Sequence, residues 1–300
     1  MQRSTVALVL TVVVVMWSPA ALASEVDGRQ FHVMVVNDDG IDAAGLEALV
    51  GVLVADPVYR VTVVAPSAQH SGSGHALVIR GEIGVHRHPP IHGATAWAVD
   101  ATPATTARIG VSTLLAEDPP DLVVSGINRG ENVGRAPWYS GTVGAAREAV
   151  IAGVPAIAVS LELDWGDPRP DWSSAARWAK PIMDAVRRHG VPKHTLLNVN
   201  IPRDTTGIRG YRLARMGLAP DAVSRYDVVR REGDSLWVKS VWSPPVETER
   251  GTDTVALSEG WITLVPLGLD QTDLDALAAL QDLGLVCETP TPEVGVATAR

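Results

Sequence analysis

A single cysteine, Cys287, stands near the end of this 300-residue chain. One thiol forms no intrachain disulfide and cannot supply the several thiolates of a structural zinc site. No cysteine stands directly after the apolar N-terminal segment either, so a lipid-anchored precursor has no attachment point there. Disulfide-stapled scaffolds, thiolate zinc proteins and lipoproteins are therefore excluded.

Blocks of basic residues are also missing. The 25 Lys and Arg residues are scattered and the formal net charge at pH 7 is −9, which argues against duplex nucleic acid as a partner. An acidic protein can still bind phosphate through backbone N–H groups and a metal ion. The sequence has no internal repeat and no low-complexity tract. Its 46% hydrophobic content suits one large domain, or one domain with an arm.

The N-terminus is typical of a secretory signal peptide over residues 1–23. Arg3 gives a positive start, residues 6–17 are almost wholly apolar, and a proline breaks the run before a small-x-small site at residues 21–23. The run is too short for a comfortable membrane span, and an uncleaved anchor is the alternative. We expect a mature chain starting near residue 24, exported to the periplasm or the medium, without stable membrane association.

Apolar, β-branched runs alternate with helix-length segments through the first two thirds of the chain. Continuous apolar strands separated by helices indicate a parallel sheet that is covered on both faces. The sequence predicts a doubly wound, mostly parallel, Rossmann-like α/β sheet over about residues 30–200. The expected strands are Phe31–Val36, Val61–Ala65, Leu122–Ser125, Ala156–Ser160 and Leu196–Ile201, and the expected helices are Ala43–Ala55, Thr102–Ala116, Gly141–Ala152 and Trp172–His189.

The pattern changes after Pro202. Short strand-like runs lie among charged and turn residues, which predicts an antiparallel C-terminal β-hairpin arm over about residues 203–255. Trp237 and Trp242 would be exposed on a lone ribbon, so either another subunit or the chain's own core covers them. A closing strand and helix over about residues 256–287 complete one domain of residues 24–300. The strand-like runs of the arm are Tyr211–Leu213, Asp227–Val229 and Leu236–Val241.

The phrase Asn37-Asp38-Asp39-Gly40 follows the first expected strand directly. Two adjacent carboxylates repel each other, so something must neutralise them. In a loop at the end of a strand, a divalent metal ion with oxygen ligands is the usual candidate. The alternative is an acidic turn that merely starts the next helix.

Further polar loops end the neighbouring strands. The carboxyl ends of parallel strands lie at one edge of the sheet, where ligands bind. Asp38 and Asp39 can offer charged oxygens to Mg²⁺ or Mn²⁺, and Ser71 and Asn128 can offer neutral ones. The helix start Ser140-Gly141-Thr142 has free N–H groups for a phosphate. The loops are residues 37–40, 65–74, 125–134 and 139–142.

These phrases together resemble the SurE family of stationary-phase survival 5′/3′-nucleotidases. The resemblance covers about residues 32–267, and it depends on the order and wording of several motifs. They are Val36-Asn37-Asp38-Asp39-Gly40, Val63-Val64-Ala65-Pro66 with Ser71-Gly72, Val123 to Asn128 with Asn132, Tyr139 to Thr142, and Gly251-Thr252-Asp253.

The resemblance implies a metal-dependent phosphomonoesterase that acts on nucleoside 5′- and 3′-monophosphates, some members also trimming short polyphosphate. It implies one divalent ion per subunit, and homodimers or homotetramers formed by exchange of the C-terminal hairpin. By match of motif, Asp38, Asp39, Ser71 and Asn128 are the expected metal ligands, with Asp38 and Asp39 catalytic. The expected phosphate and substrate residues are Asn37, Gly72, Asn132, Ser140, Gly141 and Thr142.

Two mechanisms stay open at this point. In the favoured version, water activated by the metal attacks phosphorus, because both carboxylates are needed as ligands. In the competing version Asp38 or Asp39 is itself the nucleophile. The leaving oxygen needs a proton, and His70, His75 and Asp253 are candidate donors. The sequence does not decide nucleobase preference, and Trp138 could either stack on a base or pack in the core.

The chain departs from the family in three places. Its signal peptide is an addition to a mostly cytoplasmic family. Thr105-Thr106 stands where an Asp-Cys pair is common, which leaves local packing or substrate contact open there. Gly268 stands where some members have a histidine. Other classes remain: a secreted protein that binds phosphate compounds on an inactive phosphatase scaffold, or a receiver-like domain, although a receiver is much shorter. A dinucleotide-binding domain is weaker, because no G-x-G-x-x-G follows the first strand.

Overall fold

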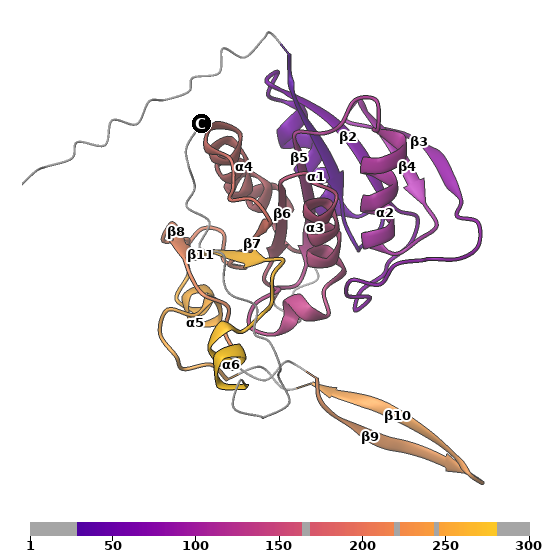
Figure 1. The fold of residues 1–300 in the computed structure, drawn as a ribbon, viewed down its shortest axis with the longest axis vertical. Helices are drawn as coiled ribbons and strands as arrows, with labels where there is room; N and C mark the ends of the chain where they lie inside the picture. The colour runs from indigo at the N-terminus through magenta and orange to yellow at the C-terminus, as the bar shows by residue number, and fades with distance from the viewer. Residues whose placement is uncertain (1–28, 164–168, 219–222, 243–245, 281–300) are drawn as a thin grey trace, which may run out of the picture.

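The structure is a computed structural model that describes residues 29–163, 169–218, 223–242 and 246–280 (Figure 1). The expected signal peptide, residues 1–23, and Cys287 lie outside the described residues. Among the described helices, none is long and apolar enough to cross a membrane.

A nine-stranded sheet forms the centre of the molecule. Its strand order is β3-β4-β2-β1-β5-β6-β7-β11-β8, and the six strands from β4 to β7 in this order are mutually parallel. Among the described residues of this sheet, antiparallel pairing occurs only where β3 meets β4 and where β11 meets β7. This confirms the predicted doubly wound, mostly parallel α/β fold. The strands are β1 (Phe31–Val36), β2 (Tyr59–Pro66), β3 (Val85–Ile91), β4 (Ala94–Val99), β5 (Leu122–Arg129), β6 (Ala156–Leu161), β7 (Thr195–Ile201), β8 (Tyr211–Leu213) and β11 (Ile262–Gly268).

Helices cover both faces of this sheet. In β1, Val33 and Val35 pack with α1 (Ala44–Val54) and α4 (Trp172–His189), and the alternate residues Met34 and Val36 pack with α2 (Pro103–Ile109) and α3 (Gly141–Ile151). Successive side chains of a strand point to opposite faces. A wholly apolar strand therefore has to be covered on both sides, as the sequence indicates.

The order of the strands creates a switch point beside β1. The chain continues from β1 to β2 on one side of it and returns to β5 on the other. In sheets of this kind the crevice for a ligand lies at the carboxyl ends of the strands beside the switch point. The loops after β1, β2 and β5 share that edge.

The sequence reasoning missed the hairpin of β3 and β4. β3 contains Pro89 and Pro90, which are tolerated because it is an edge strand. The two-residue turn is His92-Gly93, with φ of 49° and 86°, which matches the positive-φ turns that hairpins prefer. The expected single helix over Thr102–Ala116 is also divided, because α2 continues as a π-helical turn over Gly110–Leu114.

The C-terminal region differs in part from the expected arm. Tyr211–Leu213 is β8 at the edge of the main sheet, and only β9 (Val223–Glu232) and β10 (Ser235–Trp242) form the hairpin. Figure 1 shows this ribbon extending away from the body of the subunit. Trp237 is 38% exposed on it, and the side chain of Trp242 lies outside the described part. Two short helices complete the fold, α5 (Asp253–Ser258) and α6 (Leu274–Ala279).

Candidate functional site

Three elements meet at the two adjacent aspartates. Asp38 and Asp39 follow β1 after one intervening residue, Asn37, and Asp38 is only 3% exposed. The Thr142 hydroxyl, in the first turn of α3, donates to Asp38 Oδ1 at 2.5 Å. The backbone N–H of Arg129, at the end of β5, donates to Asp39 Oδ2 at 2.9 Å. The ends of β1 and β5 and the start of α3 therefore form one site.

Burial leaves both carboxylates short of compensating charge. Burial raises the pKa of Asp38 to about 6. The hydrogen bond from Thr142 lowers this pKa, and the negative charge of the neighbouring Asp39 raises it further. Burial also raises the pKa of Asp39, opposed by hydrogen bonds from the Arg129 N–H and the Gln69 side chain and by the positive charge of Arg129. In the described part of the chain no Lys or Arg side chain forms an ion pair with either carboxylate. A cation at this point would relieve that cost.

The loop after β2 closes over the same point. The His70 N–H donates to the Asp38 carbonyl at 2.7 Å, and the Ser73 N–H donates back to the His70 carbonyl at 3.2 Å. Ser71 and Gly72 form the exposed tip of this turn, where Ser71 Oγ accepts from the Gln69 amide at 3.3 Å. Ser71 therefore directly follows the residue, His70, whose backbone N–H contacts Asp38.

Buried polar atoms without partners surround the aspartates. The Asn37 amide nitrogen donates to the Gly40 carbonyl at 2.7 Å, but Asn37 Oδ1 is buried with no hydrogen-bond partner in the described structure. The same is true of Ser73 Oγ. Asn128 is buried and its amide nitrogen donates to the Gly130 carbonyl at 2.7 Å. Orphaned buried oxygens are costly unless a ligand, ion or water satisfies them.

The first turn of α3 offers N–H groups beside Asp38. Ser140 caps the helix by accepting from the Val143 N–H at 3.1 Å, so the N–H groups of Gly141 and Thr142 have no acceptor within the helix. A Cβ at Gly141 would lie 2.8 Å from Asp38 Cβ and 2.9 Å from Ser73 Oγ. Only glycine allows the helix start to approach the aspartate this closely. The buried carboxylate of Asp38 therefore lies beside backbone N–H groups that no helix carbonyl accepts.

The predicted residue Asn132 is fixed by partners that sequence reasoning missed. Its amide donates to Ser160 Oγ at 2.8 Å, its N–H donates to Asn200 Oδ1 at 2.7 Å, and its carbonyl accepts from Asn198 Nδ2 at 2.8 Å. These three partners lie on β6 and β7. The feature of the sequence that could have identified these partners is the presence of polar residues inside otherwise apolar strands. Asn132 is thus tied to the neighbouring strands rather than to the aspartates.

Two of the three candidate proton donors already have strong partners. His75 Nε2 lies 2.6 Å from Glu148 Oε2. Asp253 is fully buried and its Oδ1 accepts from the N–H groups of Gly134, Gly217 and Thr254 at 2.8–3.2 Å. It holds the loop after β5 to the base of the arm. His70 remains as the candidate next to the aspartates. Trp138 is 47% exposed, so it is not a core residue.

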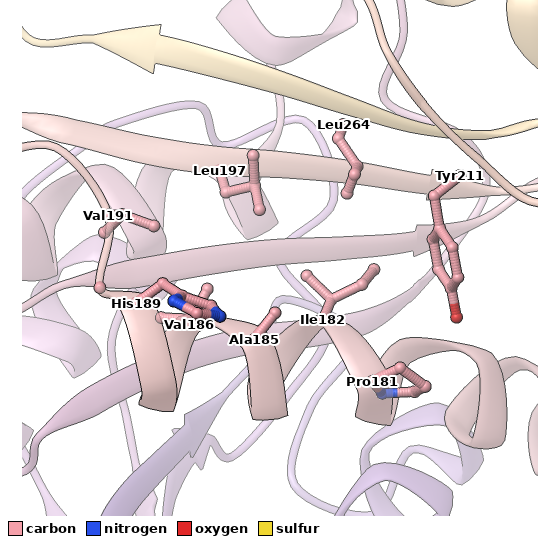
Figure 2. Close-up of a pocket in the computed structure, with 10 residues that line it drawn as sticks. Pro181, Ile182, Ala185, Val186, His189, Val191, Leu197, Tyr211 and Leu264 are labelled. Atoms are coloured by element: carbon pink, nitrogen blue, oxygen red, sulfur yellow. The ribbon is translucent and has the colours of Figure 1, made fainter. Parts of the chain in front are cut away.

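An apolar pocket of about 280 Å³ lies elsewhere. Figure 2 shows it between α4 and the strands β7, β11 and β8, lined by Ile182, Val186, Leu197, Tyr211 and Leu264 among others. No loop that carries a predicted site residue contributes to it. No group of three or more His, Cys, Asp or Glu side chains with metal-ligand spacing occurs in the described ranges. A cation at the aspartates would therefore depend on two carboxylates and neutral oxygens, as the sequence predicts.

The chain is similar to known proteins both in sequence and in fold. The family model for survival protein SurE matches residues 33–221. The 5′-nucleotidase SurE of Desulfatibacillum aliphaticivorans is 40% identical over 255 residues, which cover 84% of this chain and 97% of that protein. The 5′-nucleotidase SurE of Paramagnetospirillum magneticum is 35% identical over 263 residues, covering 85% and 96%.

A solved structure agrees with these relatives. The crystal structure of the SurE protein from Aquifex aeolicus superposes with a TM-score of 0.70 at 32% identity, and it covers 84% of this chain and 99% of that one. The resemblance inferred from the motifs is thereby confirmed along nearly the whole described chain. By sequence and by fold, the chain belongs to the SurE survival-protein family.

Proposed function

We propose that this protein is a divalent-metal-dependent 5′-nucleotidase, which hydrolyses nucleoside monophosphates to nucleoside and phosphate. The observation that carries the proposal is the desolvated Asp38–Asp39 pair, packed against the open first turn of α3. Relatives named 5′-nucleotidase SurE at 34–40% identity support the substrate class. Activity on 3′-monophosphates and on short polyphosphate is included in the proposal.

The residues of the site fit Mg²⁺ or Mn²⁺. Such an ion takes oxygen ligands, and we assign Asp38, Asp39, Ser71 and Asn128 to hold one ion per subunit. When bound, it supplies Lewis-acid polarisation of the phosphoryl group and makes water a better nucleophile. The two carboxylates then keep the charge that burial otherwise disfavours.

The phosphate is assigned to the other half of the site. The N–H groups of Gly141 and Thr142 are aimed at an anion by the start of α3. Thr142 uses its hydroxyl on Asp38 and Ser140 uses its hydroxyl as the helix cap, so both contribute through the backbone of this turn. The other assigned substrate residues are Asn37, Gly72 and Asn132.

Hydrolysis places the water oxygen on phosphorus and breaks the bond to the ribose oxygen, which leaves with a proton. We assign that proton to His70, because His75 and Asp253 are held by other partners. General acids of this kind contribute roughly a hundredfold or more to a rate. The His70 backbone already contacts Asp38, which keeps its ring in the neighbourhood of the site.

The experiment that tests the function is phosphate release by the mature chain from Ser24 onward. A panel of 5′- and 3′-nucleoside monophosphates and short polyphosphate would be incubated with Mn²⁺, with Mg²⁺ and with a chelator. We expect release from 5′-monophosphates that stops when the chelator is added. If folded protein releases nothing with any metal but still binds nucleotide, it is a binding protein on an inactive phosphatase scaffold.

We propose further that the β9–β10 ribbon holds a homodimer or homotetramer together. Its strands pair only with each other in the described structure. Apolar side chains stay exposed along it, including Tyr226 at 66%, Val229 at 61% and Val238 at 54%. A two-stranded ribbon is marginal by itself, and burying these side chains against a second copy would stabilise it.

Val238→Asp should therefore dissociate the assembly into monomers. The charge would have to be buried in the contact with a second copy, whereas within one subunit the side chain stays in water. Light scattering coupled to size-exclusion chromatography measures the mass directly. Ser235→Asp, which adds the same charge at the tip of the ribbon, should leave the mass unchanged. A Val238→Asp protein with the wild-type mass would show that the ribbon does not carry the interface.

Export of the protein is the last part of the proposal. The pattern of residues 1–23 supports it. When the full chain is expressed in a bacterial host, we expect activity in the periplasm or medium and a mature N-terminus near Ser24. Cell fractionation and N-terminal sequencing measure both. An intact Met1 on protein in the membrane fraction would instead indicate an uncleaved anchor.

A further inference from the structure

A buried carboxylate outside the site links two helices to the loop that carries Ser71. Glu148, on α3, is 1% exposed. Its Oε2 lies 2.6 Å from His75 Nε2, and its Oε1 forms an ion pair with Arg108, which belongs to α2. Burial raises the pKa of Glu148, but His75 and the Arg108 guanidinium together lower it below its usual range. The Glu148 carboxylate thus keeps its charge at a considerable desolvation cost, although it contacts neither Asp38 nor Asp39.

The segment from Ser73 to His75, which follows Ser71 closely, lies directly against the start of α3. The Gly74 N–H donates to the Tyr139 carbonyl at 2.8 Å, just before the cap of the helix. A Cβ at Gly144 would lie 2.2 Å from the Gly74 carbonyl oxygen and 3.3 Å from His75 Cα. The loop backbone therefore rests on the helix one turn beyond Gly141, with His75 reaching along it to Glu148.

The next residues of the same loop are tied to α2. The Thr102 hydroxyl donates to the Ala76 carbonyl at 2.6 Å, and Thr105 Oγ1 accepts from the Val78 N–H at 2.8 Å. Thr105 is one of the two residues that depart from the family's common Asp-Cys pair. Its hydroxyl binds the loop backbone, so the departure concerns loop packing.

We propose that Glu148 and His75 are a pair of positioning residues for the proposed reaction. Together they fix the Ser71 turn at a set distance from the first turn of α3. The inference rests on the proposed function, because Ser71 belongs to its cation half and Gly141 and Thr142 to its anion half. Residues that orient ligands from outside a metal site commonly change its affinity by about 10- to 100-fold when they are replaced.

The test compares the two partners of one carboxylate. His75→Gln removes the contact on the loop side, and Arg108→Gln removes the contact on the α2 side, outside the loop. For each, the Kd for Mn²⁺ is measured by electron paramagnetic resonance, and the Kd for inorganic phosphate with Mn²⁺ by calorimetry. The melting temperature, kcat and KM for a nucleoside 5′-monophosphate are measured on the same samples. Glu148→Gln and the Glu148→Gln, His75→Gln double variant complete a cycle.

We expect His75→Gln to raise the Kd for Mn²⁺ about tenfold, and the double variant to be no worse than Glu148→Gln alone, because both changes break one contact. Arg108→Gln should lower the melting temperature yet leave the Kd for Mn²⁺ within about twofold, since it leaves the loop contact in place. If Arg108→Gln weakens Mn²⁺ as much as His75→Gln, or if His75→Gln binds Mn²⁺ normally, the pair has only a structural role. Wild-type protein that binds no Mn²⁺ would instead contradict the proposed function itself.

Discussion

Asp38→Asn should lower kcat/KM by about a thousandfold, because the amide removes one of the two charges that hold the cation. The change keeps the shape of the side chain and an oxygen that can accept from the Thr142 hydroxyl. The loss should therefore appear in Mn²⁺ affinity and in turnover, measured by calorimetry and by phosphate release. The structure of the loop around residues 37–40 should be preserved.

Asp42→Asn is the matched control for this variant. Asp42 has the same side chain four residues later, but its side chain is 86% exposed and forms an ion pair with His88 at 3.2 Å. Its replacement should leave kcat/KM unchanged. Near-normal, metal-dependent turnover in Asp38→Asn would show that Asp38 is not a ligand.

Asp38→Asn should also stabilise the protein when no metal is present. The pKa of Asp38 lies at about 6 in the fold against 3.8 for the free group. The unfolded chain loses this proton first, so the unfolding free energy falls as pH rises from about 4 to 6 and then levels off. At pH 7 the cost is about 3 kcal/mol. The unfolding free energy, measured by urea unfolding with a chelator present, should therefore depend less on pH in Asp38→Asn than in the wild type.

Gly141→Ala should lower kcat/KM by about a hundredfold, as a displacement of about 1 Å in a site can do. The added Cβ would meet Asp38 Cβ at 2.8 Å, Ser73 Oγ at 2.9 Å and Pro103 Cγ at 3.0 Å. Either Asp38 or the first turn of α3 has to move, and both hold parts of the proposed substrate complex. The effect should appear in the Kd for inorganic phosphate as well as in turnover.

Gly51→Ala provides the comparison for that result. Gly51 lies in α1, where an added Cβ would meet only the ring of His92 at 3.3 Å, an exposed side chain that can turn away. Alanine also favours the helix by up to about 1 kcal/mol. The Gly51→Ala variant should keep the wild-type activity. If Gly141→Ala also keeps wild-type kinetics, the close approach of α3 to Asp38 has no part in catalysis.

Local pattern predicted the centre of the fold well. β1 and α4 have the bounds that the sequence indicated. A continuous apolar run such as Phe31–Val36 can be stable only as a strand covered on both faces. Helix α4 is amphipathic, its first turn is capped by Asp171 and it ends before Gly190. In each case the deciding information lies within the segment itself.

The elements that were missed are those stabilised by their neighbours. β3 has two prolines and no regular apolar alternation, and it is a strand because β4 pairs with it at the edge of the sheet. β8 has three residues and was placed with the arm, but it joins β11 in the main sheet. Strand pairing over long sequence distances is decided by packing, which short segments do not reveal.

For the site, adjacency in sequence was enough to single out the Asp38–Asp39 pair as a candidate, because a carboxylate pair after a buried strand is a local pattern. The SurE family, in contrast, was indicated by several motifs taken together along the chain. Which groups face that pair was decided by the fold. The contacts of Thr142 with Asp38 and of Glu148 with His75 span 104 and 73 residues. Such partners are brought together only when β1, α3 and the loop after β2 pack at one edge of the sheet, because burial there forces each charged or polar group to find its own partner.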